Sequence, residues 1–187
     1  MTYTPLIEKA IKIATAAHDG IYRAAYEYPL PYVSHLYSVA SLVGSHHDDE
    51  EVIAAALLHD ILEDTDYPLH KIEEHLGKRV AMLVETVTEL LKKDKHLSSW
   101  RERKELYIAK LKAAGNDAAI IASADKIHNL QSALENPAKI QIKDPTQYTW
   151  FHDEVFEVIR EKLGATYPLV VKHEEVLLLA KETFLPK

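Results

Sequence analysis

The sequence predicts an all-α protein, on the basis of its breaker content and its hydrophobic spacing. Only 5 Gly and 8 Pro interrupt the 187 residues, so few positions break regular structure. Apolar residues between these breaks recur at the spacing of one helix face, and no segment shows the strict alternation of a half-buried strand. We therefore expect one helical domain over residues 1–187, with a core at about 5–135 and a C-terminal helical extension at about 146–184.

The first predicted helix starts at a clear capping signal. Thr4 can cap its N-terminus, and Pro5 fits the first helical position, where no amide hydrogen bond is lost. The stretch from Asp19 to Pro31 is rich in Tyr, Gly and Pro and predicts a loop. Four further helices are then expected from their apolar stripes and flanking signals, at about 34–44, from Asp48 or Asp49 to about 62, at about 68–75 with Gly77 closing it, and at about 80–91.

The second half of the chain continues the helical pattern. Ser98 or Ser99 is placed to cap a helix that carries Trp100 and Tyr107, and Gly115 opens a turn before the next helix. A polar, Pro-containing stretch separates that long helix from the last two. The expected ranges of these three helices are about 118–134, about 146–163 and about 168–183.

Composition restricts the chemistry of the protein. The absence of Cys excludes disulfides, thiol catalysis, Cys-ligated zinc and iron–sulfur clusters, and leaves 11 His and 29 Asp and Glu as metal ligands. The net charge of −7 opposes binding to a nucleic-acid backbone. The N-terminus lacks the apolar stretch of a signal peptide, and the longest apolar run, residues 52–58, is too short to cross a bilayer. We expect a cytoplasmic protein that binds neither nucleic acid nor membrane.

Polar residues stand at several places where a helical core should be apolar. His35 begins an apolar helix, His59 and Asp60 end the most hydrophobic run of the chain, and Asp125 lies within an apolar helix. Burying an unpaired carboxylate is costly, so a partner must compensate these groups. Each residue alone is more often explained by packing, capping or a hydrogen bond. A divalent cation would compensate all four together.

The segments around these residues resemble the HD-domain metal-dependent phosphohydrolases. The resemblance is strongest to the hydrolase domain of the Rel/Spo alarmone enzymes and their small stand-alone relatives, and it covers about residues 5–135. It implies hydrolysis of the 3′-pyrophosphate of (p)ppGpp with Mn²⁺. The matching segments are PYVSH at 31–35, AAALLHDILEDT at 54–65, LVETVTEL at 83–90 and ADKIHNL at 124–130.

The expected site combines a metal with a pair of carboxylates. We predict that one divalent ion is held by His35, His59, Asp60 and Asp125. Mixed imidazole and carboxylate ligands suit Mn²⁺, Fe²⁺ or Zn²⁺ better than Mg²⁺ alone, and Co²⁺ and Ni²⁺ stay open. On a continuing helix, Glu63 and Asp64 lie one turn beyond His59 and Asp60, where they can orient or deprotonate the attacking water. The resemblance implies the same role, whereas a solvated acidic helix end is the alternative.

The expected substrate is a small phosphorylated nucleotide. Asn129 and Ser132 share a helix face with Asp125 and offer neutral polar groups. The resemblance implies that they and Arg23 contact the nucleotide. A basic rim that could bind a polyanion is predicted from six Lys and Arg residues, and Lys104 is the one assigned to the substrate. The other members of that rim are Lys92, Lys93, Lys95, Arg101 and Arg103.

The chain departs from the family pattern near the substrate. Ala24 and Glu89 stand where Lys is common, Leu36 replaces a Pro, and the loop between His18 and Pro31 is about three residues longer. Two alternatives therefore stay open: an HD phosphohydrolase for another nucleotide or phosphorylated metabolite, and a non-catalytic nucleotide-binding regulator. The sequence also leaves open whether the chain forms a homo-oligomer.

Overall fold

The computed structural model describes residues 3–24, 26–89, 99–137 and 142–185. Within these ranges the chain is helical apart from its connecting loops and one isolated antiparallel bridge between Tyr22 and Pro31. The all-α prediction is confirmed. The helices are α1 (Pro5–Ala17), α2 (Val33–Gly44), α3 (Glu50–Leu57), α4 (Ile61–Asp64), α5 (Leu69–Leu76), α6 (Lys78–Val87), α7 (Trp100–Ala113), α8 (Asn116–Glu135), α9 (Pro145–Leu163) and α10 (Pro168–Phe184).

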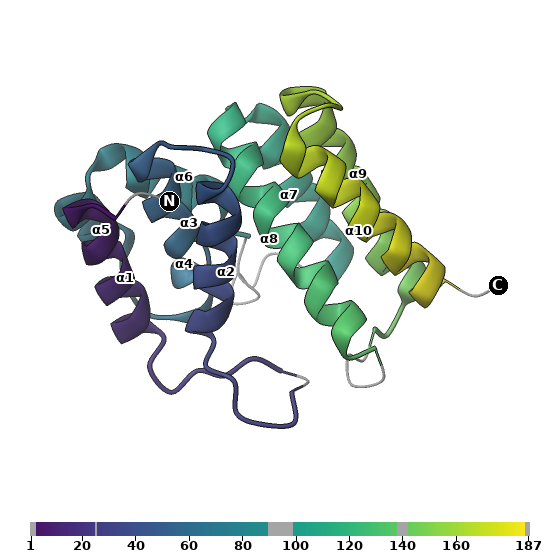
Figure 1. Cartoon of the computed structure of the whole chain (residues 1–187), viewed down its shortest axis with the longest axis horizontal. Helices are drawn as coiled ribbons and strands as arrows, with labels where there is room; N and C mark the ends of the chain where they lie inside the picture. Colours follow the sequence, from purple (N-terminus) through teal and green to yellow (C-terminus); the bar gives the residue numbers. More distant parts are fainter. Residues whose placement is uncertain (1–2, 25, 90–98, 138–141, 186–187) are drawn as a thin grey trace.

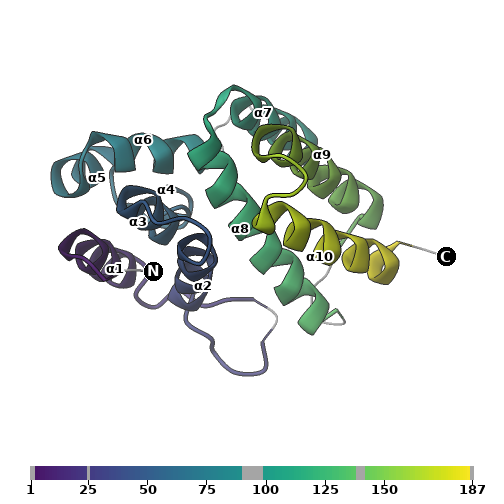
Figure 2. The same cartoon turned by 45° about the horizontal axis from the view of Figure 1, so that its top comes forward.

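The helices form two groups that meet along α8 (Figures 1 and 2). Helices α1 to α6 pack around one apolar cluster, and α7, α9 and α10 pack around a second. Consecutive residues of α8 supply Ile121 to the first cluster and Ala122 to the second, so this helix is buried on two sides. A site on α8 can therefore receive side chains from both groups.

The predicted capping signals are present in the structure. Thr4 accepts a hydrogen bond from the amide of Ile7, and Asp49 accepts one from the amide of Glu51. Ser99 forms a complete capping box with Glu102 at the start of α7. Each cap satisfies amides that the first helical turn leaves without partners. Ser98 lies outside the described residues.

One predicted helix is interrupted, and the interruption creates part of the site. The continuous helix expected to reach about residue 62 instead ends at Leu57, and α4 begins at Ile61. The amide of Leu58 bonds to the Ala55 carbonyl, one residue short of the α-helical partner, and the His59 side chain bonds to the Ala56 carbonyl. Apolar periodicity does not reveal this break. It leaves His59 and Asp60 in a turn.

Among the described residues, no helix combines the length and apolar character needed to cross a bilayer.

Candidate metal centre and adjoining cavity

Four polar side chains converge from separate parts of the fold. His35 comes from the first turn of α2, His59 and Asp60 come from the turn between α3 and α4, and Asp125 comes from the middle of α8. The Nε2 atoms of His35 and His59 are 3.2 Å apart. Asp60 Oδ2 lies 3.4 Å from the first and 3.0 Å from the second, and Asp125 Oδ1 lies 3.3 and 3.5 Å from them.

The rings of both histidines are fixed through their other nitrogen. His59 Nδ1 lies 2.8 Å from the Ala56 carbonyl oxygen, and His35 Nδ1 lies 2.8 Å from His128 Nδ1. These bonds turn both Nε2 atoms toward the carboxylates. Outer hydrogen bonds of this kind set the tautomer and the orientation of metal-binding imidazoles.

Hydrogen bonds from neighbouring side chains hold the two aspartates in place. The Tyr32 hydroxyl donates to Asp60 Oδ2 at 2.7 Å. Asp125 accepts from Lys126 on Oδ2 and from Asn129 on Oδ1, each at 2.5 Å. Burial alone would raise the pKa of Asp125, but Lys126 and the two histidines hold it well below its usual range. Asp125 is therefore an anion ready to bind a cation.

The donor set fits a divalent cation. Donor atoms of His35, His59 and Asp125 all lie within 4.8 Å of one another, and the three residues are buried. Asp60 adds an oxygen close to both imidazoles. Burial alone would lower the pKa of His59, but the charges of Asp60 and Asp125 raise it well above its usual range, so without a metal a proton takes the place of the cation. That these four residues bind a metal stays a prediction.

The predicted carboxylate pair lies on α4, directly after these residues. Glu63 Oε1 accepts a hydrogen bond from the amide of Glu89 at 2.5 Å. Burial, with the negative charge of Asp60, raises the pKa of Glu63 to about 8. Burial and Asp60 also raise the pKa of Asp64. Glu63 lines the same cavity as His59, Asp60 and Asp125, so it can reach a molecule bound there.

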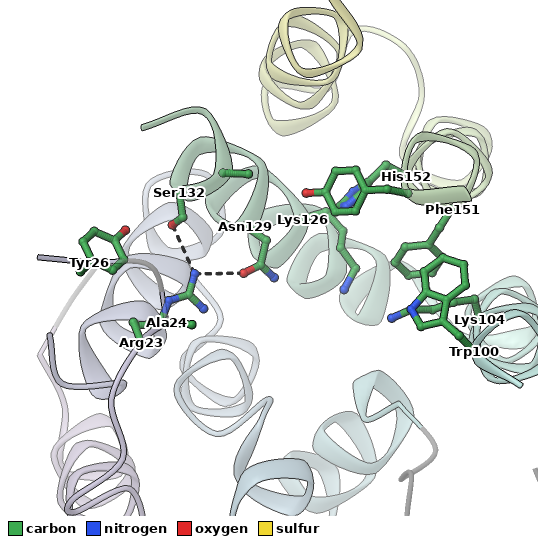
Figure 3. Close-up of a pocket in the computed structure, with 12 residues that line it drawn as sticks. Arg23, Ala24, Tyr26, Trp100, Lys104, Lys126, Asn129, Ser132, Phe151 and His152 are labelled. Atoms are coloured by element: carbon green, nitrogen blue, oxygen red, sulfur yellow. Dashed lines mark hydrogen bonds between the residues drawn. The ribbon is translucent and has the colours of Figure 1, made fainter. Parts of the chain in front are cut away.

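Two connected cavities open beside the cluster. The inner one, of about 190 Å³, is lined by three of the four candidate ligands, His59, Asp60 and Asp125, together with Glu63 and Glu89. The outer one, of about 310 Å³, lies between the 18–31 loop, α7, α8 and α9 (Figure 3). Lys104, Lys126 and Asn129 line both cavities and mark the junction.

The outer cavity contains all four predicted substrate residues. Arg23 donates to Asn129 Oδ1 and to Ser132 Oγ, each at 3.2 Å (Figure 3). Because Asn129 also donates to Asp125, a chain of hydrogen bonds links Arg23 to the candidate metal centre. Lys104 lies on the opposite side of the cavity from Arg23. Substrate contact by these residues stays a prediction.

The predicted basic rim differs from the structure. Within the described part of the segment, only Lys104 of the predicted cations lines the cavities. Arg101 stacks over Trp150 and pairs with Glu105, and Arg103 donates to the Ser99 carbonyl, so helix packing uses both. Lys92, Lys93 and Lys95 lie outside the described residues.

Sequence reasoning missed several residues of the site. Tyr32 stood in a quoted motif but had no assigned role, and Lys126 was visible as a cation beside a buried aspartate. Tyr148, Phe151 and His152 of α9, with Trp100 of α7, form the aromatic wall of the outer cavity. Their helical spacing looks like ordinary packing, so no local signal distinguishes them.

The HD domain family matches residues 10–166. A Drosophila melanogaster protein named guanosine-3′,5′-bis(diphosphate) 3′-pyrophosphohydrolase MESH1 is 33% identical over 153 residues, covering 78% of this chain and 79% of that protein. A Haemophilus influenzae protein named guanosine-3′,5′-bis(diphosphate) 3′-pyrophosphohydrolase is 35% identical over 126 residues, which is 64% of this chain but only 17% of that longer protein.

A solved structure extends the similarity to the whole fold. It is described as a metazoan ortholog of SpoT that hydrolyses ppGpp and plays a role in starvation responses. The two structures superpose with a TM-score of 0.81 at 30% identity, over 96% of this chain and 97% of the other. The likeness includes the helices after residue 135.

Proposed function

This chain belongs to the HD-domain family, and we propose that it is a metal-dependent phosphohydrolase that removes the 3′-pyrophosphate from a guanosine 3′,5′-bis(diphosphate). The observation that carries the proposal is the convergence of His35, His59, Asp60 and Asp125, with Glu63 lining the same cavity as the last three. The names of the relatives support the substrate, and the match covers 79% of the MESH1 relative.

We propose Mn²⁺ as the bound ion, because the resemblance to the alarmone hydrolases implies it and two carboxylates among the four donors suit it. When bound, the ion would supply a Lewis acid that polarises a phosphoryl oxygen and lowers the pKa of water. Glu63, whose raised pKa makes it a stronger base than an exposed carboxylate, would accept the proton of the attacking water. Asp64 would help to orient that water.

The outer cavity would hold the rest of the nucleotide. Arg23 and Lys126 supply positive charge, and Asn129 and Ser132 supply hydrogen-bonding groups for ribose or phosphate oxygens. Tyr148 and Trp100 offer rings on which a base can stack. Because α9 supplies part of this wall, we infer that the C-terminal helices belong to the same HD domain as the core.

A second candidate is hydrolysis of another nucleotide or phosphorylated metabolite by the same metal centre. Lys104 and Lys126 already pair with Glu89 and Asp125, which favours a substrate with fewer phosphates than the alarmone. The two candidate reactions differ in the product that they release, which is pyrophosphate in the first and orthophosphate in the second.

A panel of phosphorylated nucleotides tests the proposal on the whole chain loaded with Mn²⁺. Release of pyrophosphate from guanosine 3′,5′-bis(diphosphate) supports the proposed activity. Release of orthophosphate from another nucleotide, with no reaction of the bis(diphosphate), selects the second candidate. If Mn²⁺, Fe²⁺, Co²⁺, Ni²⁺, Zn²⁺ and Mg²⁺ all give no hydrolysis while nucleotide still binds, the chain is a non-catalytic regulator.

A further inference from the structure

Among the described residues, three Lys and Arg side chains line the cavities, and carboxylates already hold two of them. Lys126 Nζ lies 2.5 Å from Asp125 Oδ2, and Lys104 Nζ lies 2.5 Å from Glu89 Oε2. Arg23 instead donates to the neutral side chains of Asn129 and Ser132. The two ion pairs differ in the role of the carboxylate, because Asp125 is a candidate metal ligand and Glu89 is not.

The Lys104–Glu89 pair lies at the junction of the two cavities. Lys104 lines both, and Glu89 lines the inner one. Their side chains are only 15% and 20% exposed. The Lys104 ammonium also lies 4.3 Å from the centre of the Phe151 ring, so apolar surface covers part of it. An ammonium in such a place needs a counter-ion, and Glu89 supplies it.

Glu89 contacts the site in two separable ways. Its backbone amide donates to Glu63, and its side-chain carboxylate binds Lys104. Replacing the side chain therefore leaves the hydrogen bond to the proposed base in place. The carboxylate alone can be tested.

We propose that Glu89 is a positioning residue that sets phosphate specificity by competing with a substrate phosphate for Lys104. The inference rests on the proposed function for the position of the substrate. A phosphoryl chain that extends from the inner toward the outer cavity passes the junction at Lys104. The second phosphate of a pyrophosphoryl group must displace Glu89 from Lys104 or lie beside its negative charge. Glu89 therefore weakens binding of a 3′-pyrophosphate more than binding of a 3′-monophosphate.

The test measures binding, so that it does not depend on turnover. Glu63→Gln protein, loaded with Mn²⁺, is titrated with guanosine 3′,5′-bis(diphosphate) and with guanosine 5′-diphosphate 3′-monophosphate. The same titrations are made with Glu89→Gln, Lys104→Gln and both changes together. We expect Glu89→Gln to tighten the 3′-pyrophosphate ligand by about tenfold and the 3′-monophosphate ligand by less. With Lys104→Gln present, Glu89→Gln should no longer change the ratio of the two affinities.

Matched variants separate charge from packing. Glu89→Asp keeps the carboxylate and should keep the wild-type ratio of the two affinities. Glu89→Ser removes the carboxylate, as Glu89→Gln does, and should change the ratio in the same direction. Either of these two variants can serve for the test if the other folds poorly. An unchanged ratio in Glu89→Gln, or an equal change with and without Lys104, overturns the inference. If wild-type protein hydrolyses neither compound, the proposed function fails, but the affinity ratio still decides the role of Glu89.

Discussion

The Nδ1 atoms of His35 and His128 lie 2.8 Å apart, so one imidazole must donate and the other must accept. If His35 binds a metal through Nε2, its remaining proton is on Nδ1, and His128 Nδ1 is the acceptor. Without a metal, burial, with the charges of His35 and Arg23, lowers the pKa of His128 to about 4, and burial still favours the neutral acceptor when His35 is a neutral metal ligand. His128 therefore fixes the tautomer that His35 needs.

Removing this acceptor should weaken metal binding. We expect His128→Leu to raise the Kd for Mn²⁺ by about tenfold or more, the usual effect of losing an outer hydrogen bond of a ligand. His128→Asn keeps an acceptor oxygen and should lose less. Calorimetric titration with Mn²⁺ measures both. Equal affinity in His128→Leu and wild type would show that His35 does not need this partner.

Glu63 should matter for turnover and not for metal binding. Glu63→Gln keeps the shape and the hydrogen bond from the Glu89 amide but cannot accept a proton. We expect the metal content to match wild type and kcat to fall by about 10² to 10⁴. Asp60→Ala is the matched comparison, because it should lose the metal itself. A Glu63→Gln enzyme with wild-type kcat would remove Glu63 from the proposed step.

The same residue should produce the acidic limb of the pH profile. The pKa of Glu63 is raised to about 8 by burial and by the negative charge of Asp60. A cation bound at Asp60 offsets that charge, so the limb should lie between the ordinary 4.5 and about 8. Because the base must be deprotonated, kcat/KM should rise with pH through this range and then level off. Loss of the limb in the residual activity of Glu63→Gln confirms the assignment.

The sequence predicted which polar residues converge at the candidate metal centre better than it predicted the walls of the cavities. His35, His59, Asp60 and Asp125 could be found because each is a polar residue in an apolar stretch, and such residues need a compensating partner. The break that separates α3 from α4 could not be found, because the apolar run continues through it. The Lys104–Glu89 pair joins α7 to the segment that follows α6, and the α9 wall depends on contacts between helices distant in the chain. No local pattern records such contacts.

Asp125 should stabilise the fold as well as bind metal, because it neutralises Lys126. The two side chains are 10% and 12% exposed, and their charged atoms are 2.5 Å apart. Without metal, Asp125→Ala should lower the free energy of unfolding by about 3 to 5 kcal/mol, since it leaves a buried cation without its partner. Asp125→Ala with Lys126→Met should recover part of that loss. Urea unfolding in EDTA measures both, and a larger loss in Asp60→Ala than in Asp125→Ala would contradict the argument.

His173 should make the fold sensitive to acid. Its side chain is fully buried between α8, α9 and α10, with Nδ1 3.3 Å from Ser123 Oγ and no hydrogen bond to Nε2. Burial, with the charge of Lys126, lowers the pKa of His173 from 6.5 to about 3. Below pH 6.5 the unfolded chain therefore binds a proton that the native chain excludes. The contribution of His173 to the free energy of unfolding is therefore fully present above pH 6.5 and is lost as the pH falls toward 3.

The slope of this loss can be isolated with matched variants. One such histidine lowers the free energy of unfolding by up to about 1.4 kcal/mol per pH unit. His152 is also buried and its pKa is lowered well below the usual range by burial and by Lys126, so it adds a slope of the same sign. We expect His173→Leu to flatten the dependence between pH 6.5 and 4.5 by about one proton, measured by urea unfolding. His70→Leu, which replaces an exposed histidine, should keep the wild-type slope. If both variants keep that slope, His173 is not the group that titrates, and the acid sensitivity must come from elsewhere in the fold.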